Sequence, residues 1–181
     1  MGPTFYSLAV RTPDPTAVRE QIVNWMTAKG FELSSTRRMS RIDPDRERGF
    51  YLFSKGDWTT VLFSDIDEYD RLAFDLRKLN RPTLFLGCQD GKFWGYQLHD
   101  GNRLVDEFQT ETSYLIWPPD VRESAWKLCL ALGIEDRFYE VCRLMRRRAV
   151  RSDRALQGFC SALAITPASI PFDLIERSLF G

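Results

Sequence analysis

Histidine is almost absent from this chain, which contains only His99 among its 181 residues. Cysteine is also sparse: Cys88, Cys129, Cys142 and Cys160 include no Cys-x-x-Cys pair, and each lies among apolar neighbours. A zinc site needs several such ligands close together, so this composition argues against a metal centre. We therefore expect four buried, reduced thiols in a reducing compartment and no bound metal.

The chain also lacks long apolar runs and any surplus of charge. It has no run of about 18 apolar residues, which a membrane-spanning helix requires. Its first residues, MGPTFYSLAV, contain no basic region followed by an apolar core, so they do not resemble a signal peptide. The 25 basic and 25 acidic side chains cancel, which argues against general binding to nucleic acid or anionic membranes. These absences predict a cytoplasmic protein without a membrane partner.

The motifs of common catalytic and nucleotide-binding sites are missing as well. There is no Gly-x-Ser-x-Gly, no His-Glu-x-x-His and no Walker sequence. Gly87, Gly91 and Gly95 do not lead from a predicted strand into a helix, as the glycines of a phosphate-binding loop would. The acidic residues at 65–70 lack the spacing and the glycine of a calcium loop. The sequence therefore predicts no cofactor and favours a protein without catalytic activity.

What the chain does contain is a segment of alternating residues with two Asp-Gly pairs. Residues 82–108 read PTLFLGCQDGKFWGYQLHDGNRLVDEF, with Asp-Gly at 90–91 and again at 100–101. Asp-Gly between apolar runs is a strong hairpin signal, because both residues tolerate the positive φ angles of tight turns. The segment therefore predicts a three-stranded antiparallel meander.

Loop length decides the register of this meander. Three-residue loops at 89–91 and 99–101 would pair Trp94 with Leu86 in one hairpin and with Asp106 in the other. Two-residue loops would strand large apolar groups opposite charges, so we favour the three-residue register. One face of the sheet then collects Leu84, Leu86, Cys88, Trp94, Tyr96, Leu98 and Leu104.

Amphipathic helical patterns alternate with strands before the meander. Residues 14–30 and 64–80 form predicted helices, the first beginning at Asp14-Pro15, while residues 4–10 and 50–64 form a predicted strand and hairpin. Strands paired mostly in hairpins, with helices on the connections, predict an α+β fold. We expect a two-layer sandwich, with a mainly antiparallel sheet and two helices on one face. These two helices are expected to cover the apolar face of the meander.

The last third of the chain is predicted to be helical. Residues 120–133, 135–148 and 153–163 carry apolar side chains at helical spacing. In the first of these helices the expected apolar side comprises Trp126, Cys129, Leu130 and Leu132. We divide the chain into an α+β sheet domain at 1–112 and a small helical subdomain at 113–181. The subdomain is near the lower size limit for an independent core, so we expect it to dock onto the sheet domain.

Arginines form the strongest local concentration of charge. The cluster comprises Arg143, Arg146, Arg147, Arg148, Arg151 and Arg154, and only Asp153 offsets it. Such a cluster can bind phosphate, nucleic acid or an acidic protein surface. It is also typical of a solvated helix end, because helix C-termini favour cations and long arginine stems cover exposed surface. No nucleic-acid-binding motif accompanies the arginines, so the solvated helix end is the favoured interpretation.

Two further groups of residues are candidates for binding. Asp106 is expected opposite Trp94 and beside Tyr96, where burial could turn its carboxylate into an acid or base. Alternatively, such a carboxylate is held by an indole N–H, a tyrosine hydroxyl or backbone amides. Tyr114 and Trp117, in the apolar strip YLIWPP, are residue types that anchor protein interfaces, although the strip could equally join the two subdomains.

The residues WGYQLHDGNRLVDEF at 94–108 resemble a motif of uncharacterised bacterial proteins of similar size. In those proteins a Trp/Tyr strand, a glycine turn and Leu-Val-Asp-x-Phe follow one another in the same order. The resemblance is confined to this part of the meander, and it implies no activity and no catalytic residues.

These observations favour a non-catalytic, cytoplasmic protein-binding module, with another protein as its partner. An immunity or inhibitor protein that masks a toxin or effector has this character. Two alternatives stay open: an enzyme or small-ligand binder with a cleft around Asp106, Tyr96 and Trp94, and a nucleic-acid-associated regulator that uses Arg143–Arg154. The sequence leaves the oligomeric state open.

Overall fold

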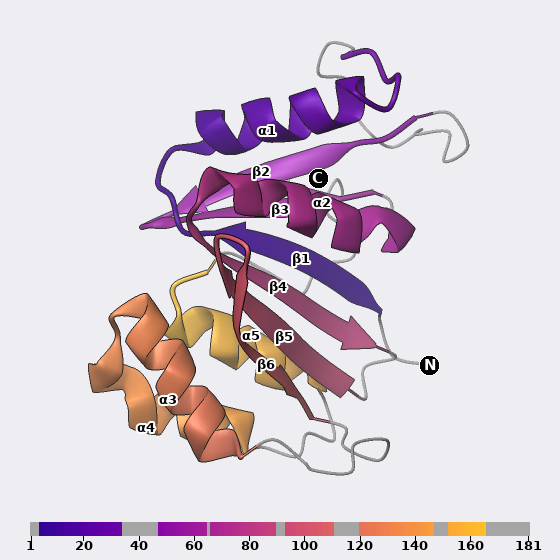
Figure 1. The fold of residues 1–181 in the computed structure, drawn as a ribbon. Helices are drawn as coiled ribbons and strands as arrows, with labels where there is room; N and C mark the ends of the chain where they lie inside the picture. The colour runs from indigo at the N-terminus through magenta and orange to yellow at the C-terminus, as the bar shows by residue number, and fades with distance from the viewer. Residues whose placement is uncertain are drawn as a thin grey trace.

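Six strands form one antiparallel sheet in the computed structural model (Figure 1). The structure describes residues 4–33, 47–64, 66–89, 93–110, 120–146 and 152–165. The strands are β1 (Phe5–Val10), β2 (Phe50–Lys55), β3 (Trp58–Phe63), β4 (Pro82–Gln89), β5 (Phe93–Asp100) and β6 (Arg103–Gln109). Their order in the sheet is β2-β3-β1-β4-β5-β6, so the first strand of the chain lies in the interior of the sheet.

Two groups of helices accompany this sheet. The first group is α1 (Pro15–Thr27) and α2 (Tyr69–Leu76), and the second is α3 (Val121–Leu132), α4 (Phe138–Met145) and α5 (Ser152–Ala162). Single 3₁₀ turns, η1 (Ile66–Glu68), η2 (Arg77–Leu79) and η3 (Glu135–Arg137), flank α2 and precede α4. The predicted α+β class is confirmed, with a mainly antiparallel sheet, two helices on one face and helices in the C-terminal part.

The helix starts follow from their capping residues. Asp14 accepts a hydrogen bond from the backbone N–H of Thr16 at 2.8 Å, and Pro15 takes the first helical position, as predicted. Asp120 accepts from the backbone N–H of Arg122 at 2.8 Å and begins α3. At the other end of α3, Gly133 has a φ of +59°, a conformation that glycine adopts without strain.

The first of two apolar cores joins α1 and α2 to one face of the sheet. Alternation along each strand sends one set of side chains to this face and the next set to the other. The buried members of this first core are Leu8, Val10, Val18, Ile22, Val61, Phe63, Tyr69, Leu72, Ala73 and Leu76. The strands β1 and β3 therefore provide most of the surface that α1 and α2 cover (Figure 1).

The second core lies on the opposite face and is the larger of the two. Its sheet members are Ala9, Trp58, Leu84, Leu86, Cys88, Trp94, Tyr96, Leu98 and Phe108, and its other members come from α3, α4, α5 and the residues just after α5. We expected α1 and α2 to cover the apolar face of the meander, and that expectation is wrong. The apolar stripes of the C-terminal helices cover this face, because α1 and α2 have an apolar surface of their own on β1 and β3.

The meander β4-β5-β6 is present as predicted, but the register of its first hairpin is shifted. Leu86 pairs with Tyr96, not with Trp94, and Trp94 pairs with Cys88. A shift of two residues leaves every side chain on the same face, since strand side chains alternate with a period of two. The predicted apolar face of β4 and β5 is therefore buried even though the pairing is displaced.

The second hairpin departs further from the prediction. Asp100 pairs with Arg103, so the loop has two residues, and Gly101 within it has a φ of +54°. The register is irregular between Leu98 and His99, which offsets the shorter loop. Asp106 consequently pairs with Leu98 and not with Trp94.

Two side chains change surroundings because of this irregularity. Leu104, which we expected on the buried face, is exposed, and Phe108 is buried there in its place, paired with Tyr96. His99, which the predicted loop at 99–101 contained, lies in β5 and is buried.

A long-range hydrogen bond connects the end of α3 with the residue that follows β1. Arg11, just after β1, donates a hydrogen bond from Nη1 to the carbonyl oxygen of Leu132 at the end of α3, at 2.6 Å. The predicted domain boundary between 112 and 113 falls outside the described residues, so the division into domains stays a prediction.

Candidate functional site

Asp106 lies where β6 meets α3, and both of its carboxylate oxygens accept hydrogen bonds. The Tyr96 hydroxyl donates to Oδ2 at 2.8 Å, and the Ser124 hydroxyl donates to Oδ1 at 3.4 Å. Asp106 as a whole residue is 8% exposed. Burial raises the pKa of Asp106, while the two hydrogen bonds and the charge of Lys127 partly offset that rise. The carboxylate is thus held by a tyrosine hydroxyl and a serine hydroxyl that come from the sheet and from α3.

Aromatic rings fill the space beside this carboxylate. Phe159 of α5 stacks on Tyr96 with ring centroids 5.5 Å apart, and it lies 5.0 Å from the ring of Trp94. Phe108 contacts both of these sheet residues. Burial, followed by the charge of Asp106, raises the pKa of Tyr96. Asp106 therefore lies in a packed aromatic core, and its carboxylate is hydrogen-bonded within that core.

His99 is a second buried polar residue of β5. Burial, with a further contribution from the charge of Arg77, lowers its pKa to about 4. An imidazole with that pKa is neutral at physiological pH. Within the described residues no group of three or more His, Cys, Asp and Glu side chains is placed to hold a metal ion.

The four cysteines, which all lie in the described ranges, form no disulfide bond and are buried. The prediction that all four cysteines are buried is therefore confirmed, and their reduced state stays a prediction. Burial raises the pKa of Cys129 to about 11, so its nucleophilic thiolate form is rare at neutral pH.

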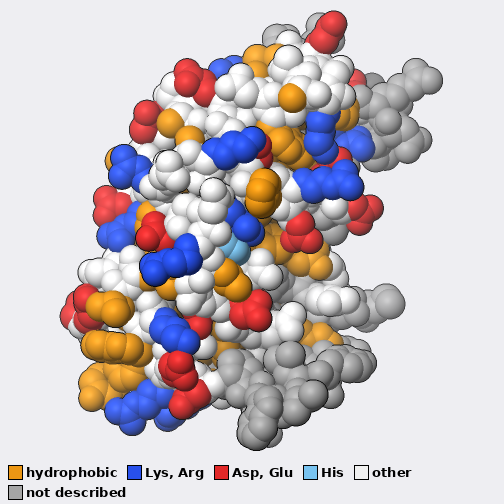
Figure 2. All heavy atoms as spheres, in the orientation of Figure 1, with side chains coloured by type: hydrophobic (Ala, Val, Ile, Leu, Met, Phe, Trp, Pro, Cys, Tyr) orange, Lys and Arg blue, Asp and Glu red, His pale blue; other side chains and the backbone are white. Residues whose placement is uncertain are grey.

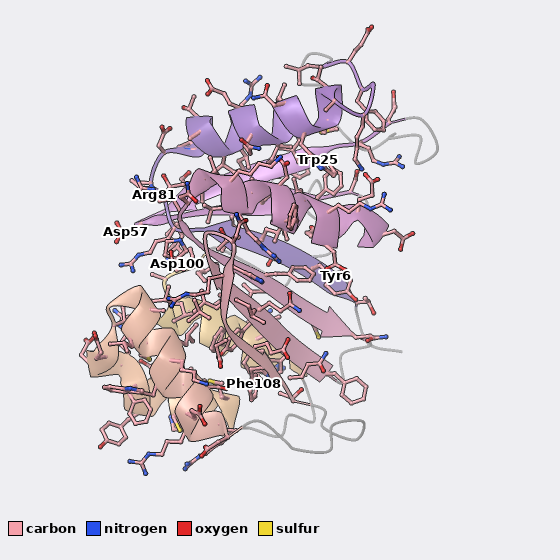
Figure 3. All side chains as sticks on the ribbon, viewed as in Figure 1. Tyr6, Trp25, Asp57, Arg81, Asp100 and Phe108 are labelled. Atoms are coloured by element: carbon pink, nitrogen blue, oxygen red, sulfur yellow. The ribbon has the colours of Figure 1, made fainter. Side chains whose placement is uncertain are left out.

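A groove with a cavity volume of about 370 Å³ lies over the part of the meander where β4 ends, β5 begins and β6 ends. It is lined by Tyr6, Phe85, Gly87, Cys88, Gln89, Phe93, Trp94, Gly95, Tyr96, Gln97, Glu107, Phe108 and Gln109. Tyr6 on β1, which is labelled in Figure 3, and Phe85 on β4 pack against the core that α1 and α2 cover, and Tyr6 pairs with Gly87. We call this cavity the sheet groove.

Two paired glycines let neighbouring groups lie close to the backbone in the sheet groove. Gly87 on β4 lies directly opposite Gly95 on β5. The ring of Tyr6 lies so close to Gly87 that a Cβ there would be 2.9 Å from its Cδ1 and Cε1 atoms. Tyr6 also stacks on Phe85, with ring centroids 5.7 Å apart. The sheet groove therefore combines aromatic rings with two glycines that carry no side chain, and glutamines and Glu107 supply its polar groups.

Exposed aromatic side chains gather on the outer surface of α3 and α4. Trp126 is 47% exposed and Tyr139 is 79% exposed. Phe138 joins them, because its ring centroid is 5.7 Å from that of Trp126 and 5.2 Å from that of Tyr139. Figure 2 shows hydrophobic side chains together over this end of the molecule, with charged side chains around them. We call Trp126, Phe138 and Tyr139 the α3–α4 aromatic patch.

A wide, open depression of about 680 Å³ lies at the α3–α4 aromatic patch. Its remaining lining residues are charged, namely Asp120, Arg122, Glu123, Glu135 and Asp136. The guanidinium of Arg122 lies 5.9 Å from the centre of the Phe138 ring, a cation–π arrangement. Carboxylates thus outnumber cations in the lining.

Sequence reasoning did not identify this patch. We expected Trp126 and Leu130 on the buried side of their helix, and both are exposed. The buried side of α3 is instead formed by Ser124, Ala125, Leu128, Cys129 and Leu132. The pattern of large apolar residues did not place Ser124 or Ala125 on the buried side of α3. Both lie there because Ser124 donates a hydrogen bond to Asp106, and because the small side chain of Ala125 lets the helix approach the sheet. The capped start at Asp120 and the spacing of small residues were the signals that could have revealed this rotation of α3.

The remaining candidates are only partly within the described residues. Arg143, Arg146 and Arg154 are exposed, and Arg143 lies in the last turn of α4, where a cation complements the helix dipole. The other members of the arginine cluster, Arg147, Arg148 and Arg151, lie outside the described residues, as do Tyr114 and Trp117.

Comparisons with protein-family models, with curated proteins and with solved structures found no significant match to this chain. The resemblance of residues 94–108 to uncharacterised bacterial proteins therefore stays a prediction. No helix in the described ranges is both long and apolar enough to cross a membrane.

Proposed function

We propose that this protein is a non-catalytic, cytoplasmic protein-binding module, and that the α3–α4 aromatic patch is its binding surface. An immunity or inhibitor protein that masks a toxin or effector is the form of this function that we favour. The observation that carries the proposal is the exposure of Trp126, at 47%, and of Tyr139, at 79%, on helices whose other sides pack over a core with buried aromatic residues.

Exposed aromatic residues of this kind are typical of binding surfaces. Tyrosine and tryptophan dominate the residues whose truncation weakens protein–protein complexes, and they bury much area at a low cost in conformational entropy. A cluster of three rings in contact is also more than the single exposed apolar residues that any surface carries. A depression beside the rings gives a partner side chain a place to enter.

The surroundings of Asp106 support a binding module more than an enzyme. A catalytic carboxylate must reach substrate, whereas Asp106 is buried and both of its oxygens accept hydrogen bonds within the protein. The same residue has a structural role, because it connects β5, β6 and α3.

A comparative capture experiment tests the proposal. Wild-type protein and the double variant Trp126→Ala/Tyr139→Ala are immobilised, and the proteins each retains from cells of the source are identified. We expect at least one protein that the wild type retains and the double variant loses, since removal of two aromatic anchors typically costs about 2 kcal/mol or more each.

Phe74→Ala is the matched control for this capture. Phe74 is 59% exposed on α2, away from the α3–α4 aromatic patch, so its removal also deletes an exposed ring. A partner lost with the double variant and kept with Phe74→Ala supports the proposal. If all three proteins retain the same set, or if no protein is specifically retained, the patch is not the binding surface.

The sheet groove favours a second candidate function, the binding of a small ligand. Its volume of about 370 Å³ falls within the range of small-molecule sites, and its lining joins aromatic rings with a few polar groups. Trp94 and Tyr96 line it, while Asp106 does not.

A small-molecule fragment screen monitored by NMR tests this function. Fragments that shift the Gly87 and Gly95 amide signals, and that lose affinity in Tyr6→Ala, would support it; a screen without such fragments would argue against it.

A further inference from the structure

We propose that the partner of the α3–α4 aromatic patch presents a basic segment, whose arginine or lysine side chain stacks on Trp126 and Tyr139 between the carboxylates of Glu135 and Asp136. This inference rests on the proposed function and names the chemistry of the partner. It follows from the charges around the patch, which are mostly negative and therefore complement a basic partner.

The carboxylates of the depression differ in how far they are already engaged. Glu123 forms an ion pair with Lys127 at 2.6 Å, and Asp120 accepts hydrogen bonds from the start of α3. Glu135 and Asp136 take part in no ion pair among the described residues. These two acids therefore provide negative charge that a partner can neutralise.

The aromatic rings of the patch also differ in whether a cation already lies over them. Arg122 already occupies one face of the patch through its contact with Phe138. No cation of the described residues lies over the ring of Trp126 or Tyr139. An arginine guanidinium is planar, stacks on aromatic faces and bonds carboxylates in pairs, so it suits rings and acids that lie together.

Charge complementarity also argues against the other occupants of this surface. An acidic segment or a phosphate-bearing nucleic acid would meet Asp120, Glu123, Glu135 and Asp136 with like charge. A purely apolar segment would leave the charges of Glu135 and Asp136 without a partner at the rim, at a cost that grows as water is excluded.

Three labelled peptides of equal length test the inference by fluorescence anisotropy. In the first peptide arginine alternates with leucine, in the second citrulline replaces each arginine, and in the third glutamate does. Citrulline keeps the shape of arginine without its charge. We expect the arginine peptide to bind about ten-fold more tightly than the citrulline peptide, and the glutamate peptide not to bind.

Two pairs of substitutions locate that binding. Glu135→Gln/Asp136→Asn should weaken binding of the arginine peptide about five-fold, and the effect should fade as salt is added. Glu20→Gln/Asp57→Asn changes the net charge equally at exposed positions on α1 and beside β3, and it should leave the affinity unchanged. Trp126→Ala/Tyr139→Ala should also weaken binding.

The results separate failure of this inference from failure of the proposed function. Equal binding of the arginine and citrulline peptides, no binding of either, or no effect of Glu135→Gln/Asp136→Asn would overturn the basic partner. If capture of a cellular protein is then still lost in Trp126→Ala/Tyr139→Ala, the proposed function survives alone. Self-association in sedimentation that Glu135→Gln/Asp136→Asn abolishes would support the inference, and would identify a second copy of this chain as the partner that presents the basic segment.

Discussion

Asp106 connects three elements through one carboxylate. Tyr96 brings its hydroxyl from β5 and Ser124 brings its hydroxyl from α3. Replacement by alanine would leave both hydroxyls buried without this acceptor, and a lost buried partner typically costs about 1–3 kcal/mol. Asp106→Asn keeps the shape and one acceptor oxygen, so it should be far milder than Asp106→Ala. Urea denaturation of the two variants measures this difference.

The raised pKa of Asp106 adds a pH dependence with a definite sign. Since its pKa is higher in the folded protein than in the unfolded chain, the folded protein binds the proton more tightly. Its contribution to stability is therefore present below the ordinary carboxyl pKa and is lost as pH rises through the folded pKa. Asp106→Asn lacks this loss, so its stability relative to the wild type should increase from about pH 4 to about pH 7. A constant difference between these pH values would contradict the assignment.

His99 should titrate far from the ordinary range of histidine. Burial and the charge of Arg77 lower its pKa to about 4. The neutral imidazole stabilises the folded protein above the unfolded pKa of about 6.5, and this contribution is lost as pH falls toward the folded value. Because the chain has a single histidine, its imidazole proton signal is unambiguous in NMR spectra. A midpoint near 6.5 in folded protein would show that His99 is hydrated.

At the scale of elements, the contact between β5 and β6 depends on the absence of a side chain at Gly95. A Cβ there would collide with the carbonyl oxygen of Phe108 and lie 2.9 Å from Gln109 Cγ. Backbone atoms cannot move aside easily, so Gly95→Ala should destabilise the protein by about 3 kcal/mol. Gly87→Ala meets only the ring of Tyr6, which can rotate, and should cost about 1 kcal/mol.

A double-mutant cycle separates these two glycines. In a Tyr6→Ala background the cost of Gly87→Ala should disappear, because the ring that it meets is gone. The cost of Gly95→Ala should persist in the same background. Thermal or urea denaturation of the variants measures both effects, and equal costs for the two glycines would contradict this account.

The elements differ in how far the sequence could predict them. Asp14-Pro15 and Asp120 act on the backbone next to them, so these helix starts are readable from a few residues. The register of the meander is not, because a two-residue loop at Gly101 and an irregularity at Leu98 offset one another and leave nearly the same faces buried. Local turn signals cannot distinguish such compensating changes.

The face of each helix was harder to predict than its ends. Trp126 and Leu130 looked like core residues because they are large and apolar, yet small residues face the sheet from α3. The layer that each helix joins also depends on contacts far apart in the sequence. The meander face had two possible covers, and only the packing of α3, α4 and α5 decides between them. The patch that we propose as a binding surface follows from that choice.

For the whole molecule, the larger core is shared between the sheet and the C-terminal helices. Phe159 on α5 is fully buried against Tyr96 and Trp94. Phe159→Ala should therefore cost about 3–5 kcal/mol. The loss should appear in a single transition, with helical circular dichroism and tryptophan fluorescence changing together. Separate transitions for the two probes would show that the helices unfold independently of the sheet, and Phe74→Ala serves as the exposed control.

The order of the strands and helices along the chain has a consequence for folding during synthesis on the ribosome. The core between β1, β3, α1 and α2 can close once β4 has been made, because all its strands and helices precede that point. The opposite face, with Trp94, Tyr96 and Leu98, stays bare until α3, α4 and α5 follow. During that interval the nascent chain exposes a broad apolar surface, and chaperones bind such surfaces. Premature termination before α3 would make that exposure permanent and leave an aggregation-prone fragment.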